Sequence, residues 1–221
     1  MTIIDDYLKL QEEQVKRFNE TTLLFMQVGH FYEAYAVDNA KEKSNADNVY
    51  RVADILNIQV TRKNKNIQEN SRGNPIMIGV NLFSIEKHTG ILMDAGYTLV
   101  LMEQVGDPPN ITREITRVYS PGTYLPVKTI GGAQSNYLLS VFLETVPNDN
   151  SRRMKNIGMS VIDFATGKSI TYEVYSKKSN NDFNYALDET FRFIQVYNPS
   201  EVIFMINESP ENIQNITEIS H

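Results

Sequence analysis

The chain has 221 residues, of which 41% are hydrophobic and 22% are charged, a composition typical of globular proteins rather than disordered chains or coiled coils. Its 21 basic and 27 acidic side chains give a net charge of −6, which excludes a uniformly basic nucleic-acid coat but not a local basic site. The absence of cysteine excludes disulfides and thiolate sites, and the three histidines have no metal-ligand spacing. No apolar run approaches the roughly 18 residues of a membrane span, and the acidic start fits no export signal, so we expect an intracellular protein outside the membrane.

The spacing of apolar residues divides the first part of the chain into predicted strands and helices. The strands are short apolar runs, and we expect them over residues 23–28, 58–61, 76–80, 97–102 and 114–119. The helices have apolar residues three and four positions apart, and we expect them over residues 3–18, 38–56 and 84–96. Asp38 and Ser84 are the expected N-caps of the second and third helices, and Gly29 and Gly96 end a strand and a helix.

Between residues 120 and 136 two prolines and three glycines interrupt this pattern, so we expect a domain boundary near residue 125. The domains would be residues 1–125 and residues 126–221, the second incomplete at its C-terminal end. Beyond the boundary we expect strands over residues 137–146, 157–164, 169–175 and 202–206 and a helix over residues 182–197. Three strands, a helix and a strand in this order indicate an α/β domain of the ribonuclease H-like kind.

A first candidate site begins where the apolar run of residues 23–28 ends. Gly29 is followed by two aromatic residues and an acid, which can be a strand end with core packing or an exposed binding element. In the second interpretation Phe31 projects from a rigid strand end and Glu33 stands beside it. A projecting aromatic beside a carboxylate can stack on a nucleic-acid base and hydrogen-bond its edge.

A second candidate site is the polar loop over residues 62–75. It holds Arg62, Lys63, Lys65 and Arg72 against a single glutamate, in a chain that is otherwise acidic. Such a loop is either a solvated connection or a set of phosphate contacts, which position a protein on DNA without reading its sequence.

Five segments of the chain resemble motifs of the MutS family of DNA mismatch repair proteins, in the family's order and over residues 21–123. The first, Gly29-His30-Phe31-Tyr32-Glu33-Ala34-Tyr35, resembles the GDFYELF signature of the mismatch-recognition domain. The others are similar to the family's Thr-Lys-Arg, Pro-x-x-Gly-Ile, Glu-Gln-Ile-Gly-Asp-Pro and Arg-x-x-Thr-Pro-Gly-Thr, and they are residues 61–63, 75–80, 103–108 and 117–123. Residues 162–167 resemble the Asp-x-Ser-Thr-Gly turn of the family's connector domain.

Two departures from the family pattern lie close to the first site. His30 replaces the aspartate of the signature, so a group that can be positive stands in place of a fixed negative charge. Asn81-Leu82-Phe83 replaces the family's Pro-Tyr-His. Frequent Asn and Ile indicate an AT-rich genome, which fits the branch of giant viruses and octocoral mitochondria. The compartment would then be a viral replication site in the host cytoplasm or the mitochondrion.

The resemblance implies a mixed-sheet α/β mismatch-recognition domain followed by a ribonuclease H-like connector domain. Phe31 would enter the minor groove and stack on the mispaired base, and Glu33 would hydrogen-bond the edge of the displaced base. A carboxyl near phosphates should have a raised pKa, so Glu33 can act there as a protonated donor. The expected DNA-backbone contacts are His30, Arg62, Lys63, Lys65 and Arg72. Tyr32 alternates to the other face of its strand and is expected in the core.

The chain lacks the G-x-x-x-x-G-K-[ST] phosphate loop, so we expect no enzymatic activity, cofactor or metal within it. The resemblance implies that a full-length protein would be a homodimeric ATPase that uses ATP and Mg²⁺, binds mismatched duplex DNA and meets repair partners through the connector.

Two alternatives concern residues 126–221, which could be a nuclease or a protein-docking module. A two-metal nuclease would use Asp163 and several converging carboxylates, but the neighbouring strand offers only Glu173. Asp188 and Glu189 are adjacent positions of the predicted helix and face differently. Glu103, Gln104 and Asp107 are interpreted as a structural turn after a strand rather than a catalytic site.

Overall fold

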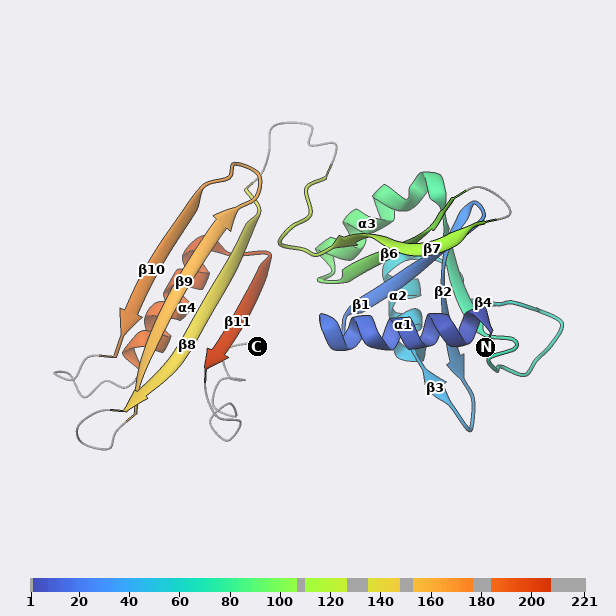
Figure 1. Cartoon of the computed structure of the whole chain (residues 1–221), viewed down its shortest axis with the longest axis horizontal. Helices are drawn as coiled ribbons and strands as arrows, with labels where there is room; N and C mark the ends of the chain where they lie inside the picture. The colour runs from blue at the N-terminus through green and yellow to red at the C-terminus, as the bar shows by residue number, and fades with distance from the viewer. Residues whose placement is uncertain (1, 107–109, 127–134, 148–152, 177–183, 208–221) are drawn as a thin grey trace. The chain divides into compact units, whose positions relative to one another are not determined.

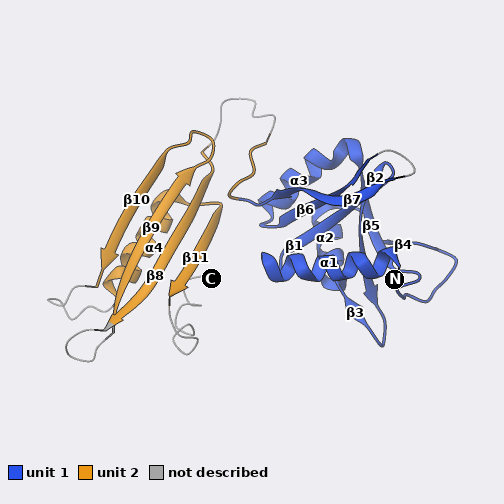
Figure 2. Ribbon diagram, viewed as in Figure 1, with its two compact units in different colours: residues 1–121 blue, residues 122–221 orange. Residues whose placement is uncertain are grey.

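The computed structural model describes residues 2–106, 110–126, 135–147, 153–176 and 184–207 (Figure 1). The chain divides into two compact units, residues 1–121 and residues 122–221 (Figure 2). The boundary expected near residue 125 lies just beyond this division. Each unit has its own sheet and its own buried core.

Unit 1 is a mixed seven-stranded sheet with helices on both faces. Its strands are β1 (Thr22–Val28), β2 (Phe31–Asp38), β3 (Lys43–Ser44), β4 (Thr61–Arg62), β5 (Ile76–Asn81), β6 (Thr98–Val105) and β7 (Thr112–Tyr119). Its helices are α1 (Ile3–Arg17), α2 (Ala46–Leu56), α3 (Ile85–Asp94) and the short 3-10 helix η1 (Leu82–Ser84). The order is β4-β5-β2-β1-β6-β7 with β3 paired to β2, and among the described strands of unit 1 only β1 and β6 pair in parallel. The mixed-sheet α/β fold predicted for this part is therefore confirmed.

The two central strands explain why the sequence shows continuous apolar runs instead of alternation. Helix α1 lies on one face of the sheet, and α2 and α3 lie on the other (Figure 1). A strand covered on both faces must be apolar at every position. Accordingly, all residues of the two runs Leu23–Met26 and Leu99–Met102 are buried.

Helix α1 completes the sheet where β1 and β2 separate. These strands pair only from Met26 to Val28, next to the turn that joins them. Further along β1 the side chain of Gln11 takes the place of a strand: it accepts from the amide of Leu24 and donates to the carbonyl of Thr22, both at 2.7 Å. A buried backbone group needs a partner, so this glutamine satisfies β1 and ties α1 to it.

One predicted helix starts at a different place. Asp38 is the last residue of β2, and a tight hairpin to β3 follows, because the side chain of Asn39 accepts from the amides of Lys41 and Glu42 at 2.8 and 2.9 Å. The helix α2 begins only at Ala46. The N-cap prediction for Asp38 was therefore wrong, and of the strand expected over residues 58–61 only Thr61 lies in a strand, β4.

Unit 2 is a four-stranded sheet with one described helix. Its elements are β8 (Tyr137–Pro147), β9 (Arg153–Asp163), β10 (Ser169–Tyr175), α4 (Tyr185–Tyr197) and β11 (Glu201–Asn207). The order is β10-β9-β8-β11, antiparallel except for the parallel β8–β11 pair, and α4 packs on the apolar face of β8 and β9. The predicted element order is present, while the ribonuclease H-like assignment stays a prediction. The predicted start of α4 at residue 182 lies outside the described residues.

No helix among the described residues combines the length and the apolar character that crossing a bilayer requires.

Candidate nucleic-acid interface

The turn between β1 and β2 holds Phe31 in a fixed position. Gly29 in this turn has φ 59°, a left-handed conformation that glycine adopts without steric cost. The carbonyl of His30 accepts from the amide of Leu82 at 2.9 Å, which ties the turn to the end of β5. Phe31 then pairs with Val28 on one side and with β5 on the other. Its side chain is nevertheless 47% exposed, so a rigid backbone presents an aromatic ring to solvent.

Glu33 lies on the same face of β2 as Phe31, because alternate residues of a strand point the same way. It is partly buried and stands between Met26 of β1 and Gly79 of β5. A Cβ at Gly79 would lie 3.7 Å from Cγ of Glu33, an ordinary van der Waals contact, so the two positions are direct neighbours. The hydroxyl of Tyr35, the next residue on this face, donates to Oε2 of Glu33. An aromatic ring and an anchored carboxylate therefore stand side by side.

Tyr32 occupies the opposite face, and its prediction as a core residue is confirmed by its burial. Its hydroxyl donates to Oε1 of Glu103, and burial together with this carboxylate raises the pKa of Tyr32 to about 12. Glu103 also receives a hydrogen bond from Thr116 at 2.7 Å and an ion pair from Arg117. Burial alone would raise the pKa of Glu103, but the three hydrogen bonds together lower it. Glu103 thus joins β2, β6 and β7 as a structural group, and Asp107 lies outside the described residues.

The polar loop is held by its own backbone. The guanidinium of Arg62 donates to the carbonyls of Ile67 and Gln68 at 3.1 and 2.7 Å. Lys63 and Lys65 are exposed, and within the described ranges of the chain neither forms an ion pair. Lys63 and Lys65 are therefore available to bind an anion, and Arg62 stabilises the loop that carries them.

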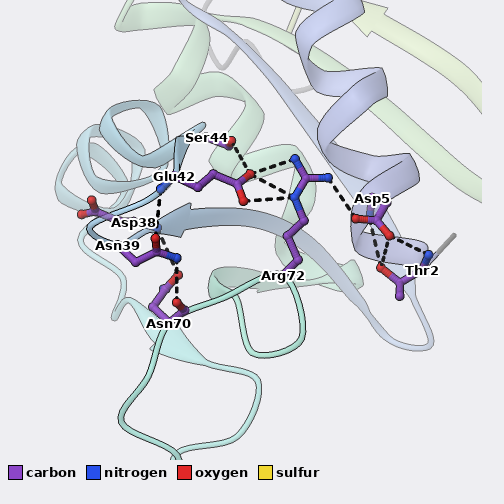
Figure 3. Close-up of polar contacts among 8 residues, drawn as sticks. All are labelled: Thr2, Asp5, Asp38, Asn39, Glu42, Ser44, Asn70 and Arg72. Atoms are coloured by element: carbon purple, nitrogen blue, oxygen red, sulfur yellow. Dashed lines mark hydrogen bonds and ion pairs between the residues drawn. The ribbon is translucent and has the colours of Figure 1, made fainter.

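Arg72 is turned toward the protein (Figure 3). Its Nη1 lies 2.9 Å from Oδ1 of Asp5 in α1, and its Nη2 lies 2.9 Å from Oε1 of Glu42 in the β2–β3 hairpin. The hydrogen bond from Arg72 lowers the pKa of Glu42. The pKa of Asp5 falls to about 2, first through the backbone of Thr2 and then through Arg72. A phosphate would have to compete with two carboxylates for this side chain.

Arg72→Gln should therefore lower the stability of the chain in a pH-dependent way. Carboxylates with a depressed pKa contribute stability above about pH 4, and this contribution is lost as the pH falls. The difference between the urea midpoints of parent and variant should be clear at pH 6 and smaller at pH 3. If Arg72 serves DNA instead, the midpoints will coincide, and the variant of the full-length protein will lose roughly one unit of salt slope in DNA binding.

Arg113 is a residue of this face that the sequence prediction missed. Met26 pairs with Glu33 on one side and with Met102 on the other. Gln104, two positions beyond Met102 on the same strand, pairs with Arg113. Paired residues share a face, and alternate residues return to it. Arg113 is also exposed, so a cation stands on the Glu33 face. The expected strand began at residue 114 and excluded it.

Phe83 is a second missed residue. It follows the end of β5, the strand that pairs with Phe31, and its ring is 90% exposed. Its amide donates to the side chain of Asn81 at 2.9 Å, which fixes the turn into η1. The only sequence signal was the replacement of the family's Pro-Tyr-His by Asn81-Leu82-Phe83.

Asp163 of unit 2 has a structural use in the described structure. It is buried and accepts from the amides of Asn136 and Ala165 at 3.0 Å and from the hydroxyl of Thr166 at 2.8 Å. Burial acts to raise the pKa of this carboxyl, but the hydrogen bonds outweigh it and lower the pKa. Glu189 pairs with Arg192 instead of facing Asp163. Over the described parts of the chain no three His, Asp or Glu side chains gather as a metal site.

Known proteins resemble the chain over its length. The family model for MutS domain I matches residues 8–128. A putative DNA mismatch repair protein mutS homolog of Acanthamoeba polyphaga mimivirus is 36% identical over 96% of the chain, which covers 18% of that protein. DNA mismatch repair protein MutS of Staphylococcus aureus strain Newman is 30% identical over 94% of the chain and 20% of its own length. DNA mismatch repair protein MutS 2 of Haloarcula marismortui is 29% identical over 86% of the chain and 17% of its own length.

The chain spans about a fifth of the length of these relatives. The matched residues 8–128 include the hairpin with Phe31 and Glu33 and the whole polar loop. The resemblance predicted from the five motifs is thereby confirmed: the chain belongs to the MutS family of DNA mismatch repair proteins and contains its domain I.

Proposed function

We propose that this chain recognises mispaired or unpaired bases in duplex DNA as the amino-terminal part of a longer MutS-like protein. The observation that carries the proposal is Phe31, an aromatic ring 47% exposed on a backbone that is paired on both sides. An exposed aromatic on a mobile loop would lose conformational freedom when it inserts between bases. Here folding has already fixed the backbone that carries the ring.

The discrimination follows from two energies of similar size. Unstacking a base step costs a few kcal/mol, and it costs least where a base is mispaired or unpaired. Stacking of a base on an aromatic side chain returns about 1–3 kcal/mol. Insertion of Phe31 is therefore close to neutral or unfavourable in matched DNA and favourable at a mismatch, without any reading of the surrounding sequence.

Contacts with the DNA backbone would supply affinity without discrimination. Lys63 and Lys65 are exposed, and His30 lies in the exposed turn beside Phe31, so these three residues would make the backbone contacts. Arg62 supports their loop, while Arg72 is the least available of the predicted backbone contacts because Asp5 and Glu42 already hold it.

Several further roles belong to the proposal because the relatives are about five times as long as the chain. Binding and hydrolysis of ATP with Mg²⁺, homodimer formation and contacts with repair partners would take place in the longer protein. Unit 2 would be the connector domain, with a ribonuclease H-like fold.

The test is a binding titration of the full-length protein with two labelled duplexes that differ only in a central G·T or G·C pair. We expect tighter binding to the G·T duplex at physiological salt, where phosphate contacts alone cannot distinguish the two. Equal affinity for both duplexes would remove the proposed function.

A further inference from the structure

Tyr35 is the residue on β2 that links the candidate site to the core. We propose that Tyr35 is a positioning residue: its hydroxyl holds Oε2 of Glu33, so that Oε1 alone meets the displaced base and does so as an acceptor. The inference rests on the proposed function, and it adds a preference among bases. It starts from the hydrogen bond that Tyr35 donates to Glu33, at the position where the MutS signature has phenylalanine.

The hydroxyl of Tyr35 cannot move away from Glu33 without disturbing buried groups. The Tyr35 side chain is 5% exposed, and its ring packs edge-on against Tyr7 of α1 with the centroids 5.2 Å apart. Tyr7 is fixed in turn, because its hydroxyl donates to the carbonyl of Leu24 at 2.8 Å. The side-chain amide of Asn45 donates to the backbone carbonyl of Tyr35 at 2.9 Å. The core therefore sets the direction of this donor.

The surroundings of Glu33 leave this hydrogen bond without a competitor on the described part of the chain. Its pairing neighbours Met26 and Gly79 offer no polar side chain. Arg113 faces the same side of the sheet, where its charge acts to lower the pKa of Tyr35. Burial and the contact with Glu33 outweigh that charge and raise the pKa of Tyr35, so the hydroxyl keeps its proton and remains a donor. Tyr7 is the other titratable group packed against this hydroxyl.

The chemical consequence is a fixed polarity toward the base. The oxygens of an ionised carboxyl only accept hydrogen bonds, and Tyr35 occupies one of the two oxygens of Glu33. Thymine presents a ring N–H at N3, whereas adenine presents a bare ring nitrogen at N1 beside its N6 amino donor. With Oε1 directed at the ring nitrogen, an unpaired thymine should therefore suit Glu33 better than an unpaired adenine. Without the hydroxyl of Tyr35, the carboxyl could rotate, and this selectivity should fall.

The test uses the full-length protein and duplexes with one unpaired thymine or one unpaired adenine in the same flanking sequence. The measured quantity is the ratio of the two affinities. We expect the parent to favour thymine and Tyr35→Phe, which keeps the ring and removes only the hydroxyl, to reduce the ratio about three- to tenfold. The thermal midpoint of the variant should stay close to the parent's, because the packing against Tyr7 is retained.

Glu33→Gln provides the matched control for orientation. If Tyr35 donates to the amide oxygen of the new side chain, its NH₂ group faces the base, and the preference should shift toward adenine. In the double variant with Tyr35→Phe the amide is free to turn, and the ratio should approach one. If Tyr35 only stabilised the fold, removing its hydroxyl would not change which of the two bases the Glu33→Gln variant prefers.

The outcomes separate this inference from the proposed function. A parent that binds duplexes with an unpaired base no better than matched duplex contradicts both. A parent that prefers the unpaired base, with a thymine-to-adenine ratio that Tyr35→Phe leaves unchanged in both the Glu33 and the Glu33→Gln backgrounds, overturns the role of Tyr35 alone.

Discussion

Phe31→Ala is expected to abolish the preference of the full-length protein for mismatched over matched duplex DNA. Phe31 is 47% exposed in the free protein, so its truncation removes less buried area than truncation of a core phenylalanine would. It takes away the stacking energy of about 1–3 kcal/mol, which corresponds to roughly 5- to 150-fold in affinity for the mismatched duplex. Binding to matched duplex, which depends on phosphate contacts, should change little. Titrations with G·T and G·C duplexes measure both effects.

Phe18→Ala is the matched control for this prediction. Phe18 caps the C-terminal end of α1, near the start of β1 and away from the turn that carries Phe31, and it is 40% exposed. Its substitution removes the same atoms from a similar degree of exposure and should leave mismatch preference intact. Loss of preference in both variants would show a general effect of removing aromatic surface, and retention of preference in Phe31→Ala would exclude Phe31 as the wedge.

Phe25→Ala should have the largest effect on stability. Phe25 lies in the middle of β1, pairs with Leu101 of the parallel strand β6 and is 0% exposed. Truncation of a buried phenylalanine removes its transfer free energy and leaves a cavity, which together cost about 3–5 kcal/mol. A domain of this size has a total stability of about 5–15 kcal/mol, so unit 1 should become marginal.

Urea denaturation of the chain measures this cost from the shift of the unfolding transition, with Phe18→Ala as the surface reference. The free energy of unfolding of the Phe18→Ala variant should stay within about 0.5 kcal/mol of the parent's, not counting the loss of the contact between the Phe18 ring and Arg17. A cost below about 1 kcal/mol for Phe25→Ala would mean that the β1–β6 core can collapse into the space left by the ring.

Aromatic residues thus have two roles in a short stretch of sequence, in the buried core and at an exposed strand end, and hydrophobicity alone does not separate them. The continuous run around Phe25 identified a strand covered on both faces, because only such a strand is apolar at every position. The alternation after Gly29 correctly assigned Tyr32 to the core. The exposure of Phe31, however, depends on which segments pack around the end of its strand, which no local pattern encodes.

The sequence by itself determined strands β1 and β6, the first helix, the element order of unit 2 and the family, because apolar periodicity and ordered motifs act over a few neighbouring residues. Only the tertiary structure decided which polar groups meet. Asn39 closes a hairpin where a helix start was expected, and Arg72 pairs with Asp5 across 67 residues of sequence. Tyr35 reaches Glu33 because two strand positions share a face, and Tyr7 from a separate helix holds it there. Such contacts arise when packing brings distant segments together. Their energies depend on the burial of the groups and on the direction of the hydrogen bonds, and neither is defined until the chain has folded.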